Sequence, residues 1–342
     1  MTQDVPTNQK AERLDSGYLA SAFNWCARRT HAVVLAMVLV TCAGFAGNVH
    51  WFFDAMNHTR WHLVGIGGVI FVILALHRRG PWMALALGVV ACNLLVVAPW
   101  DWYSTHGATQ ATGPEVKVLF WNINAGSRNT DQMTRLIRQA APDVVALLEV
   151  HHDHIGSLAW LRKDYPAYRE RPRSGAFGLA VYSRLPVQWD EQQRDPPEIR
   201  GVVNGGESAT GNVAAFDLWA VHVFPPMNST NRSDRNRQFE RIAEDRVAQR
   251  STGRPLIMGG DLNITPWCHE FRKLVADAGL LDTRAGQGYQ ATWPTGLGRL
   301  GIPIDHVLVS QQWEVLGRRV LEGHGVSDHS AVLVTLRQSD NR

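Results

Sequence analysis

The hydrophobic positions of this chain are unevenly distributed, because almost all of the long apolar runs lie before residue 101. Three runs contain no Asp, Glu, Lys or Arg, and they cover residues 32–53, 61–77 and 81–100. A membrane-spanning helix needs about 20 apolar residues, with a range of about 17–25. The pattern predicts three transmembrane helices: the first is long enough if it extends to Trp51–Phe53, and the second is short. A signal peptide followed by buried core helices is the alternative interpretation.

Lysine and arginine gather on one side of the predicted spans. Four of them, Lys10, Arg13, Arg28 and Arg29, precede the first run, and two more, Arg78 and Arg79, lie between the second and third runs. The loop between the first and second runs carries only Arg60. Because Lys and Arg mark the cytoplasmic side, residues 1–30 are predicted to be a cytoplasmic N-terminal segment. Three crossings place everything after Trp100 outside, which predicts a multi-pass protein of the inner (cytoplasmic) membrane with a periplasmic domain.

The pattern changes after the third run. Residues 101–115 are polar and contain Gly, Thr and Pro, so they are predicted to form a linker. From residue 116 to 338, short apolar stretches alternate with helical spacing and loops, which predicts one further domain. Helix faces are predicted in Thr130–Ala140 and at Phe239, Ile242, Ala243 and Val247. The predicted strands cover residues 116–121, 144–148, 178–182, 214–221, 255–258, 305–309 and 331–336.

Polar side chains stand where these strands end. Asn122, Glu149 and His222 directly follow apolar strands, and Asp261 and Asn263 come after a strand and two glycines. Strands that end at one edge of a sheet bring such residues together. A single one of them is explained by a turn or a helix cap, but the whole set favours a functional site.

The residues also carry a family resemblance. The segments in order are FWNINAG (120–126), ALLEV (146–150), VHVFPP (221–226), GGDLN (259–263), PIDHVLVS (303–310) and VSDHSAVL (326–333). Residues 116–338 thereby resemble the endonuclease/exonuclease/phosphatase superfamily, which is DNase I-like. The resemblance implies an α+β fold, a four-layer sandwich with two packed β-sheets flanked by helices, here preceded by the bundle of three transmembrane helices.

The resemblance implies a metal site with hard oxygen ligands. Glu149 resembles the family's main Mg²⁺ carboxylate, Asn122 would add a neutral oxygen, and Asp328 would add a second carboxylate. Mg²⁺ prefers few carboxylates together with waters and substrate phosphate oxygens. Mg²⁺ is therefore the expected cofactor, with Mn²⁺ as an alternative.

The catalytic roles are carried over in the same way. Asp261 would orient or deprotonate the attacking water, Asn263 would hold that water or a phosphoryl oxygen, and His329 would stabilise developing charge. Asp305 resembles the acid that pairs with this histidine and keeps it cationic. His222 resembles a second histidine, a phosphate ligand or the acid for the leaving group.

Two further residues are candidates for substrate binding, and both keep an ordinary alternative. Asn124 is either a second polar ligand or a loop cap. Arg184 either clamps a substrate phosphate or is a solvated loop cation. Many family members carry Asp-Tyr where this chain has Asp305-His306, which leaves an aromatic partner for the substrate in doubt.

The substrate class is less sharply indicated. From Glu115 onward the chain has 27 Lys+Arg and 26 Asp+Glu, whereas a nuclease that grips several phosphates needs a basic stripe. The anchor raises the effective concentration of substrates in the same leaflet. The arrangement resembles membrane-anchored bacterial members linked to vancomycin and teicoplanin resistance. We therefore expect a metal-dependent phosphoesterase that hydrolyses a phosphate ester or pyrophosphate on a lipid or lipid-linked substrate. An anchored nuclease or nucleotide phosphodiesterase is the alternative, and a catalytically inactive membrane scaffold is disfavoured by the intact polar set.

Overall fold

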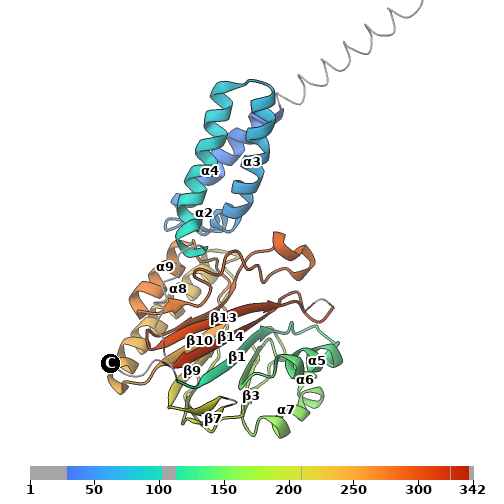
Figure 1. Cartoon of the computed structure of the whole chain (residues 1–342), viewed down its shortest axis with the longest axis vertical. Helices are drawn as coiled ribbons and strands as arrows, with labels where there is room; N and C mark the ends of the chain where they lie inside the picture. Colours follow the sequence, from blue (N-terminus) through green and yellow to red (C-terminus); the bar gives the residue numbers. More distant parts are fainter. Residues whose placement is uncertain (1–28, 102–112, 209, 324, 339–342) are drawn as a thin grey trace, which may run out of the picture.

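The computed structural model describes residues 29–101, 113–208, 210–323 and 325–338. Residues 1–28 of the predicted cytoplasmic segment and residues 102–112 of the predicted linker lie outside the described residues. The rest forms an elongated helical bundle that stands on a larger α+β domain (Figure 1).

The bundle contains two helical stretches that are long and apolar enough to cross a membrane. They are Trp51–Leu76, with 26 residues, and Gly80–Ala98, with 19 residues. A third apolar helix, Arg29–Phe45, is shorter. The first stretch consists of α2 (Trp51–Met56), the 3-10 helix η1 (Asn57–Thr59) and α3 (Arg60–Leu76), and the second belongs to α4 (Gly80–Asp101). The helices pack through small and aliphatic residues, including Val34, Met37, Leu63, Leu74 and Ala86.

The first predicted run does not form one continuous helix. Its helix ends at Phe45, and Trp51–Phe53 begin α2 instead. The turn between them is tightly packed, because a Cβ atom added at Gly44 would lie 2.9 Å from the Asn57 and Arg60 side chains, and one at Gly47 would lie 2.8 Å from Asn57. The extension of the first helix to the aromatic residues was therefore a wrong prediction.

Two six-stranded sheets pack face to face in the second domain. One has the order β13-β14-β1-β2-β4-β3, and the other has the order β11-β12-β10-β9-β6-β5. The first sheet contains β1 (Glu115–Asn122), β2 (Val144–Leu148), β3 (Ala167–Arg171), β4 (Leu179–Ser183), β13 (Trp313–Leu321) and β14 (Ala331–Gln338). The second contains β5 (Val187–Trp189), β6 (Glu198–Val203), β9 (Phe216–Val221), β10 (Leu256–Asp261), β11 (Leu281–Asp282) and β12 (Asp305–Val309). A small hairpin is formed by β7 (Gly206–Ser208) and β8 (Gly211–Val213).

Three apolar cores hold this domain together, and they define four layers. The core between the sheets includes Phe120 and Leu148 of the first sheet and Leu218 and Val307 of the second. A second core lies between the first sheet and the helices α5 (Thr130–Ala140), α6 (His154–Ser157) and α7 (Ala159–Asp164). The third lies under α8 (Ser229–Gln249) and α9 (His269–Ala278). The 3-10 helices η2 (Arg250–Thr252) and η3 (Thr295–Leu300) complete the order of elements. The predicted sandwich of two sheets flanked by helices is thereby confirmed.

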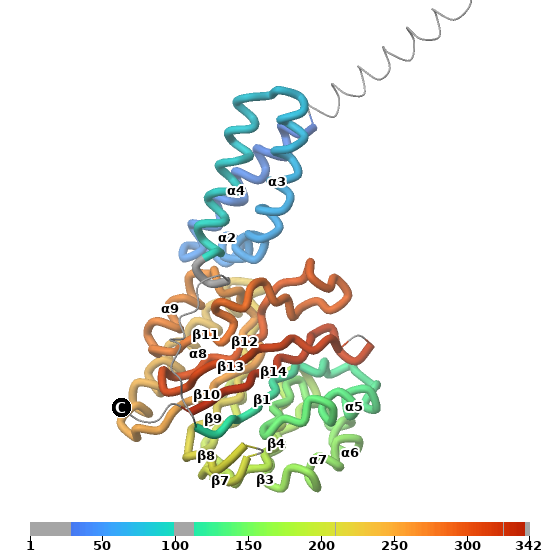
Figure 2. The backbone as a smooth tube through the Cα atoms, viewed as in Figure 1, coloured from blue at the N-terminus to red at the C-terminus, as the bar shows by residue number. Residues whose placement is uncertain are grey.

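The bundle packs directly on the two-sheet domain. Asp54 of α2 and Arg235 of α8 form an ion pair of 2.9 Å with side chains that are 1% and 0% exposed. Beside it, the Trp267 indole N–H donates to the carbonyl of Asn57. Arg232 donates to the Asn48 carbonyl at 2.9 Å. Because these contacts, two of them buried, join segments about 200 residues apart, the bundle and the domain form one packed unit (Figure 2).

Candidate active site

The site forms where strands of both sheets reach the same edge. β1 ends at Asn122, and Glu149 directly follows β2, which runs parallel to β1. In the other sheet β10 ends at Asp261, and the antiparallel strand β12 begins at Asp305, directly opposite Asp261 in register. Strand direction therefore explains why these side chains, far apart in the sequence, meet.

Asn122 lies between the two sheets and links their carboxylates. Its side-chain nitrogen donates to Glu149 Oε1 at 2.9 Å and to Asp261 Oδ2 at 3.1 Å. Its side-chain oxygen accepts from the Asn124 backbone N–H at 3.0 Å. The amide nitrogen, and not the expected oxygen ligand, thus faces the carboxylates.

Three of the site residues have a backbone conformation that L-residues rarely adopt. The φ angles are 59° at Asn124, 58° at Glu149 and 51° at Asn263. Asparagine tolerates this left-handed region, whereas glutamate does so at a cost. Such strain persists only where the surrounding structure imposes it. At Glu149 the surroundings hold the carboxylate against Asn122 and the Ala125 backbone N–H, which is 3.1 Å from Oε2.

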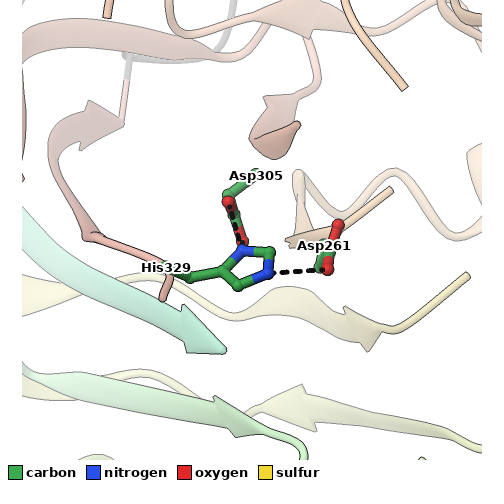
Figure 3. Close-up of side chains that lie close together, drawn as sticks. All are labelled: Asp261, Asp305 and His329. Atoms are coloured by element: carbon green, nitrogen blue, oxygen red, sulfur yellow. Dashed lines mark hydrogen bonds and ion pairs between the residues drawn. The ribbon is translucent and has the colours of Figure 1, made fainter. Parts of the chain in front are cut away.

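His329 lies between two aspartates (Figure 3). Its Nδ1 is 2.9 Å from Asp305 Oδ2, and its Nε2 is 3.7 Å from Asp261 Oδ2. Burial alone would lower the pKa of His329, but the carboxylates of Asp305 and Asp261 outweigh burial and raise that pKa to about 10. Burial raises the pKa of Asp305. For Asp261 burial acts in the same direction, yet the two nearby histidines His329 and His222 outweigh it and lower its pKa. His329 is therefore a cation at neutral pH.

His222 and Asn263 border Asp261. His222 Nε2 lies 3.6 Å from Asp261 Oδ2, and its ring packs on Phe177 with centroids 5.0 Å apart. The other ring nitrogen, Nδ1, is buried and has no hydrogen-bond partner among the described residues. The Asn263 backbone N–H donates to Asp261 Oδ1 at 2.9 Å, and its side chain donates to the Val223 carbonyl at 2.8 Å.

Asp328 is held by two donors on opposite sides. The Asn124 side chain donates to its Oδ1 at 2.7 Å, and the Trp293 indole N–H donates to its Oδ2 at 3.0 Å. Although burial acts to raise the pKa of Asp328, these donors outweigh it and lower the pKa. Asn124 is also a loop cap, because its Oδ1 accepts from the Gly126 N–H at 2.8 Å. Both alternatives for Asn124 thus describe part of its role as a positioning residue.

The sequence reading missed three residues that support the site. Trp293 donates a hydrogen bond to Asp328, and the centroid of its ring lies 6.2 Å from the centroid of the His329 ring. The Ser327 hydroxyl donates to the Asn122 carbonyl at 2.7 Å and accepts from the His329 N–H. Thr292 accepts from the Asp305 N–H at 3.2 Å. Ser327 could have been found from its place in the VSDHS segment, whereas the loop with Thr292 and Trp293 has no periodicity to mark it.

Arg184 does not reach the site. It follows β4, which runs antiparallel to β2, so that Ser183 pairs with Val144 at the start of β2, the end remote from Glu149. Its guanidinium packs over the Tyr165 ring at 4.9 Å. The structure therefore does not bring this candidate to the substrate-binding position.

The residue after Asp305 and the glycine directly before Asp261 have structural explanations. His306 is buried, its Nε2 lies 2.8 Å from the Ile264 carbonyl, and burial lowers its pKa to about 3. Gly260 has φ 142°, and a Cβ atom there would lie 1.9 Å from the Val221 carbonyl oxygen. The close approach that Gly260 permits is thus to the neighbouring strand β9, which aligns Asp261 with His222.

The donor set fits a hard divalent cation. Asp261, Asp305 and His329 offer atoms within 4.8 Å of one another, but His329 is protonated and bonded to Asp305, so it is a poor ligand. Glu149 and Asp261 instead converge on one amide of Asn122, and two anions that face a shared point favour a cation between them. Oxygen donors of this kind suit Mg²⁺, Ca²⁺ and Mn²⁺.

The fold and site together define a hydrolase-type centre built on a two-sheet sandwich. The profile of the Endonuclease/Exonuclease/phosphatase family matches residues 119–329, and the chain belongs to this family. Members of the family are hydrolases that act on phosphoester bonds and generally depend on divalent metals. Among curated proteins no match was found.

Solved structures share the fold at low sequence identity. An endonuclease/exonuclease/phosphatase from Beutenbergia cavernae is 22% identical, with a TM-score of 0.50 over 66% of this chain and 72% of that one. TDP2 from D. rerio complexed with a single-strand DNA product is 15% identical, with a TM-score of 0.50 over 66% and 99%.

Proposed function

We propose that this protein is a Mg²⁺-dependent phosphoesterase of the inner membrane, with its catalytic domain on the outer side. Its substrate is a phosphate ester or pyrophosphate on a lipid or lipid-linked molecule. The single observation that carries the lipid assignment is the direct packing of the apolar bundle on the catalytic domain, through the buried Asp54–Arg235 pair.

The charge distribution supports the proposed orientation. Arg78 and Arg79 connect α3 to α4, and this connection lies at the end of the bundle remote from the catalytic domain (Figure 1). Because lysine and arginine favour the cytoplasmic side, the catalytic domain falls on the opposite side. The Arg29–Phe45 helix is the third crossing in this proposal, and its shortness is accommodated by local thinning of the bilayer.

Each polar residue has a role in the proposed hydrolysis. Glu149, Asn122 and Asp328 would hold the metal, for which the Asn122 amide would have to turn its oxygen toward Glu149. The metal would supply Lewis-acid polarisation of a phosphoryl oxygen. Asp261, kept ionised by the two histidines, orients the attacking water and accepts its proton.

The remaining groups act on the phosphoryl group itself. As the water oxygen bonds to phosphorus, the ester P–O bond breaks and the leaving oxygen takes a proton from His222. Cationic His329 stabilises the charge that develops on the phosphoryl oxygens, with Asp305 fixing its tautomer. Asn263 holds a phosphoryl oxygen or the water.

The test follows phosphate release from a polyprenyl diphosphate by the full-length protein in detergent, with Mg²⁺ or EDTA, and plasmid nicking in parallel. Asp261→Ala removes the base and should lower the rate by roughly 10²–10⁴-fold. Asp277→Asn, an exposed carboxylate on α9 that pairs with Lys273, is the matched control and should keep full activity. Mn²⁺ in place of Mg²⁺ tests the metal preference.

Three outcomes are decisive. Mg²⁺-dependent phosphate release that is lost in Asp261→Ala supports the proposal. Nicking without phosphate release would refute the lipid assignment and make the protein an anchored nuclease. Phosphate release that survives both EDTA and Asp261→Ala would refute the assigned site.

A further inference from the structure

An apolar groove lies between the membrane-type helix α3 and the segment that borders the active site. Its volume is about 730 Å³, within the size range of small-molecule binding sites. The α3 side contributes Trp61, Ile66 and Val69, and the other wall contributes Tyr289, Leu297 and Leu300. Figure 2 shows this second segment, between α9 and β12, on the side of the domain that faces the bundle.

The groove is a built feature, because its two walls are joined. His62 Nε2 lies 2.7 Å from the Leu300 carbonyl oxygen. The Trp61 and Tyr289 rings meet edge to face, with centroids 5.7 Å apart. The Tyr289 hydroxyl in turn donates to the Gly301 carbonyl. The walls are thus fixed at their base, while apolar side chains stay exposed above it: Val69 is 63% exposed, Leu297 55% and Leu300 67%.

The same segment reaches the active site with its other residues. Trp293 donates to the Asp328 carboxylate, and the Thr295 N–H donates to the Asp328 carbonyl at 2.8 Å. Leu297 is four residues beyond Trp293, and four residues span at most about 14 Å. A molecule with its phosphate at the metal site could therefore place a chain in the groove.

We propose that this groove binds the hydrocarbon chain of the lipid substrate while its phosphate occupies the active site; this inference rests on the proposed function. One wall is a helix apolar enough to cross a membrane, so the groove is continuous with the surface that faces lipid chains. The Tyr289 hydroxyl and the His62 Nε2 already bond backbone carbonyls of the second wall, and the exposed lining side chains Val69, Leu297 and Leu300 are apolar, which suits a hydrocarbon chain.

Two glycines of α3 provide a matched pair of variants. A Cβ atom at Gly65 or at Gly68 would meet no atom within 4 Å, so both positions accept a side chain. Gly65 lines the groove and Gly68 does not. Gly65→Phe fills the groove, whereas Gly68→Phe places the same side chain elsewhere on the same helix.

The test uses the full-length protein in vesicles of phosphatidylethanolamine and phosphatidylglycerol. Hexadecyl phosphate with a diazirine in mid-chain is photoactivated, and the modified residues are mapped by mass spectrometry. We expect labelling at Tyr289 and Leu297. Each methylene of the probe that is kept out of the groove weakens its binding by up to about fourfold. Because the Phe side chain in Gly65→Phe would displace several methylenes, this variant should lower the labelling about tenfold or more. Gly68→Phe should leave it unchanged.

Phosphate release from polyprenyl diphosphate is measured on the same preparations, which separates the two proposals. Labelling of the groove without hydrolysis would keep the groove and refute the proposed function. Hydrolysis with labelling spread evenly over the bundle, or with labelling that Gly65→Phe does not reduce, would keep the function and refute the groove.

Discussion

The backbone at Glu149 offers a test of how the site is held. Alanine is usually more stabilising than glycine, but the φ angle of 58° at this position should make glycine the more stable of the two substitutions. Glu149→Ala and Glu149→Gly both remove the carboxylate and its bonds to Asn122 and Ala125. The two variants differ only in the Cβ atom. Any difference in stability between them therefore reports the backbone conformation alone.

The magnitude follows from two opposing effects. A Cβ atom in the left-handed region costs about 1–2 kcal/mol, whereas glycine costs about 0.5–1 kcal/mol in backbone entropy. Glu149→Gly should therefore be more stable than Glu149→Ala by about 0.5–1 kcal/mol. For a domain of this size that corresponds to roughly 1–4 °C in Tm.

The assay is thermal unfolding of the full-length variants in detergent with EDTA, because a bound metal would shift the folding equilibrium. Arg135, an exposed position inside α5, provides the control pair. There, alanine should be more stable than glycine by about 1 kcal/mol. If glycine were also the less stable residue at position 149, the argument that the fold imposes strain on Glu149 would be refuted.

Three further predictions concern the site and its support. The pKa of His329 is raised from 6.5 to about 10, so its contribution to stability is complete below pH 6.5 and is lost as the pH rises through about 10. In Asp305→Asn this loss of stability should begin at a lower pH. Melting temperatures of Asp305→Asn that depend on pH as those of the unsubstituted protein do would contradict this. Gly260→Ala should destabilise the fold by several kcal/mol. Gly253 also has a positive φ, 70°, but a Cβ atom there would meet no atom within 4 Å, so Gly253→Ala should destabilise the fold by about 1 kcal/mol. Equal melting temperatures of the two variants would show that the contact with Val221 is relieved easily. Asp54→Ala should lower the free energy of unfolding by about 3–5 kcal/mol, because it leaves the Arg235 charge buried without its partner. The loss should be seen as protease cleavage at the junction between the bundle and the domain. An Asp54→Leu/Arg235→Met double variant that resists the protease no better than Asp54→Ala would argue against the unpaired charge as the cause.

The sequence was most informative where a periodic apolar pattern coincided with clear boundaries. Thr130–Ala140 and Val144–Leu148 match α5 and β2 residue for residue, because a buried face and Pro142 mark their ends. The strands β3, β5, β6, β7, β8, β11 and β13 were not predicted. All but β6 are short or lie at a sheet edge, and most of their residues are half-buried or exposed, since edge strands contact the core on only part of one face. The interior strand β6 is buried, but its sequence EIRGVV mixes charged and apolar residues.

The candidate site shows a different limit. Asn122, Glu149 and Asp261 meet as expected from strand ends, and Asp305, which the family resemblance supplied, joins them from the start of β12. Arg184 does not, because its strand runs the other way, and strand direction within a sheet is set by tertiary contacts that local sequence does not encode. The groove behind Trp293 was equally inaccessible to sequence reasoning, since it depends on how a loop packs on a helix more than 200 residues away.

The packed junction between the bundle and the catalytic domain has a kinetic consequence in the proposed orientation. With Asp54 and Arg235 buried against each other, the reaction centre keeps a fixed height above the bilayer and meets its substrates in a plane. Turnover would then be limited by lateral diffusion and by the mole fraction of the substrate among the lipids. Mixing inert lipid into the vesicles should slow the reaction, whereas diluting the same vesicles with buffer should leave the rate per protein unchanged.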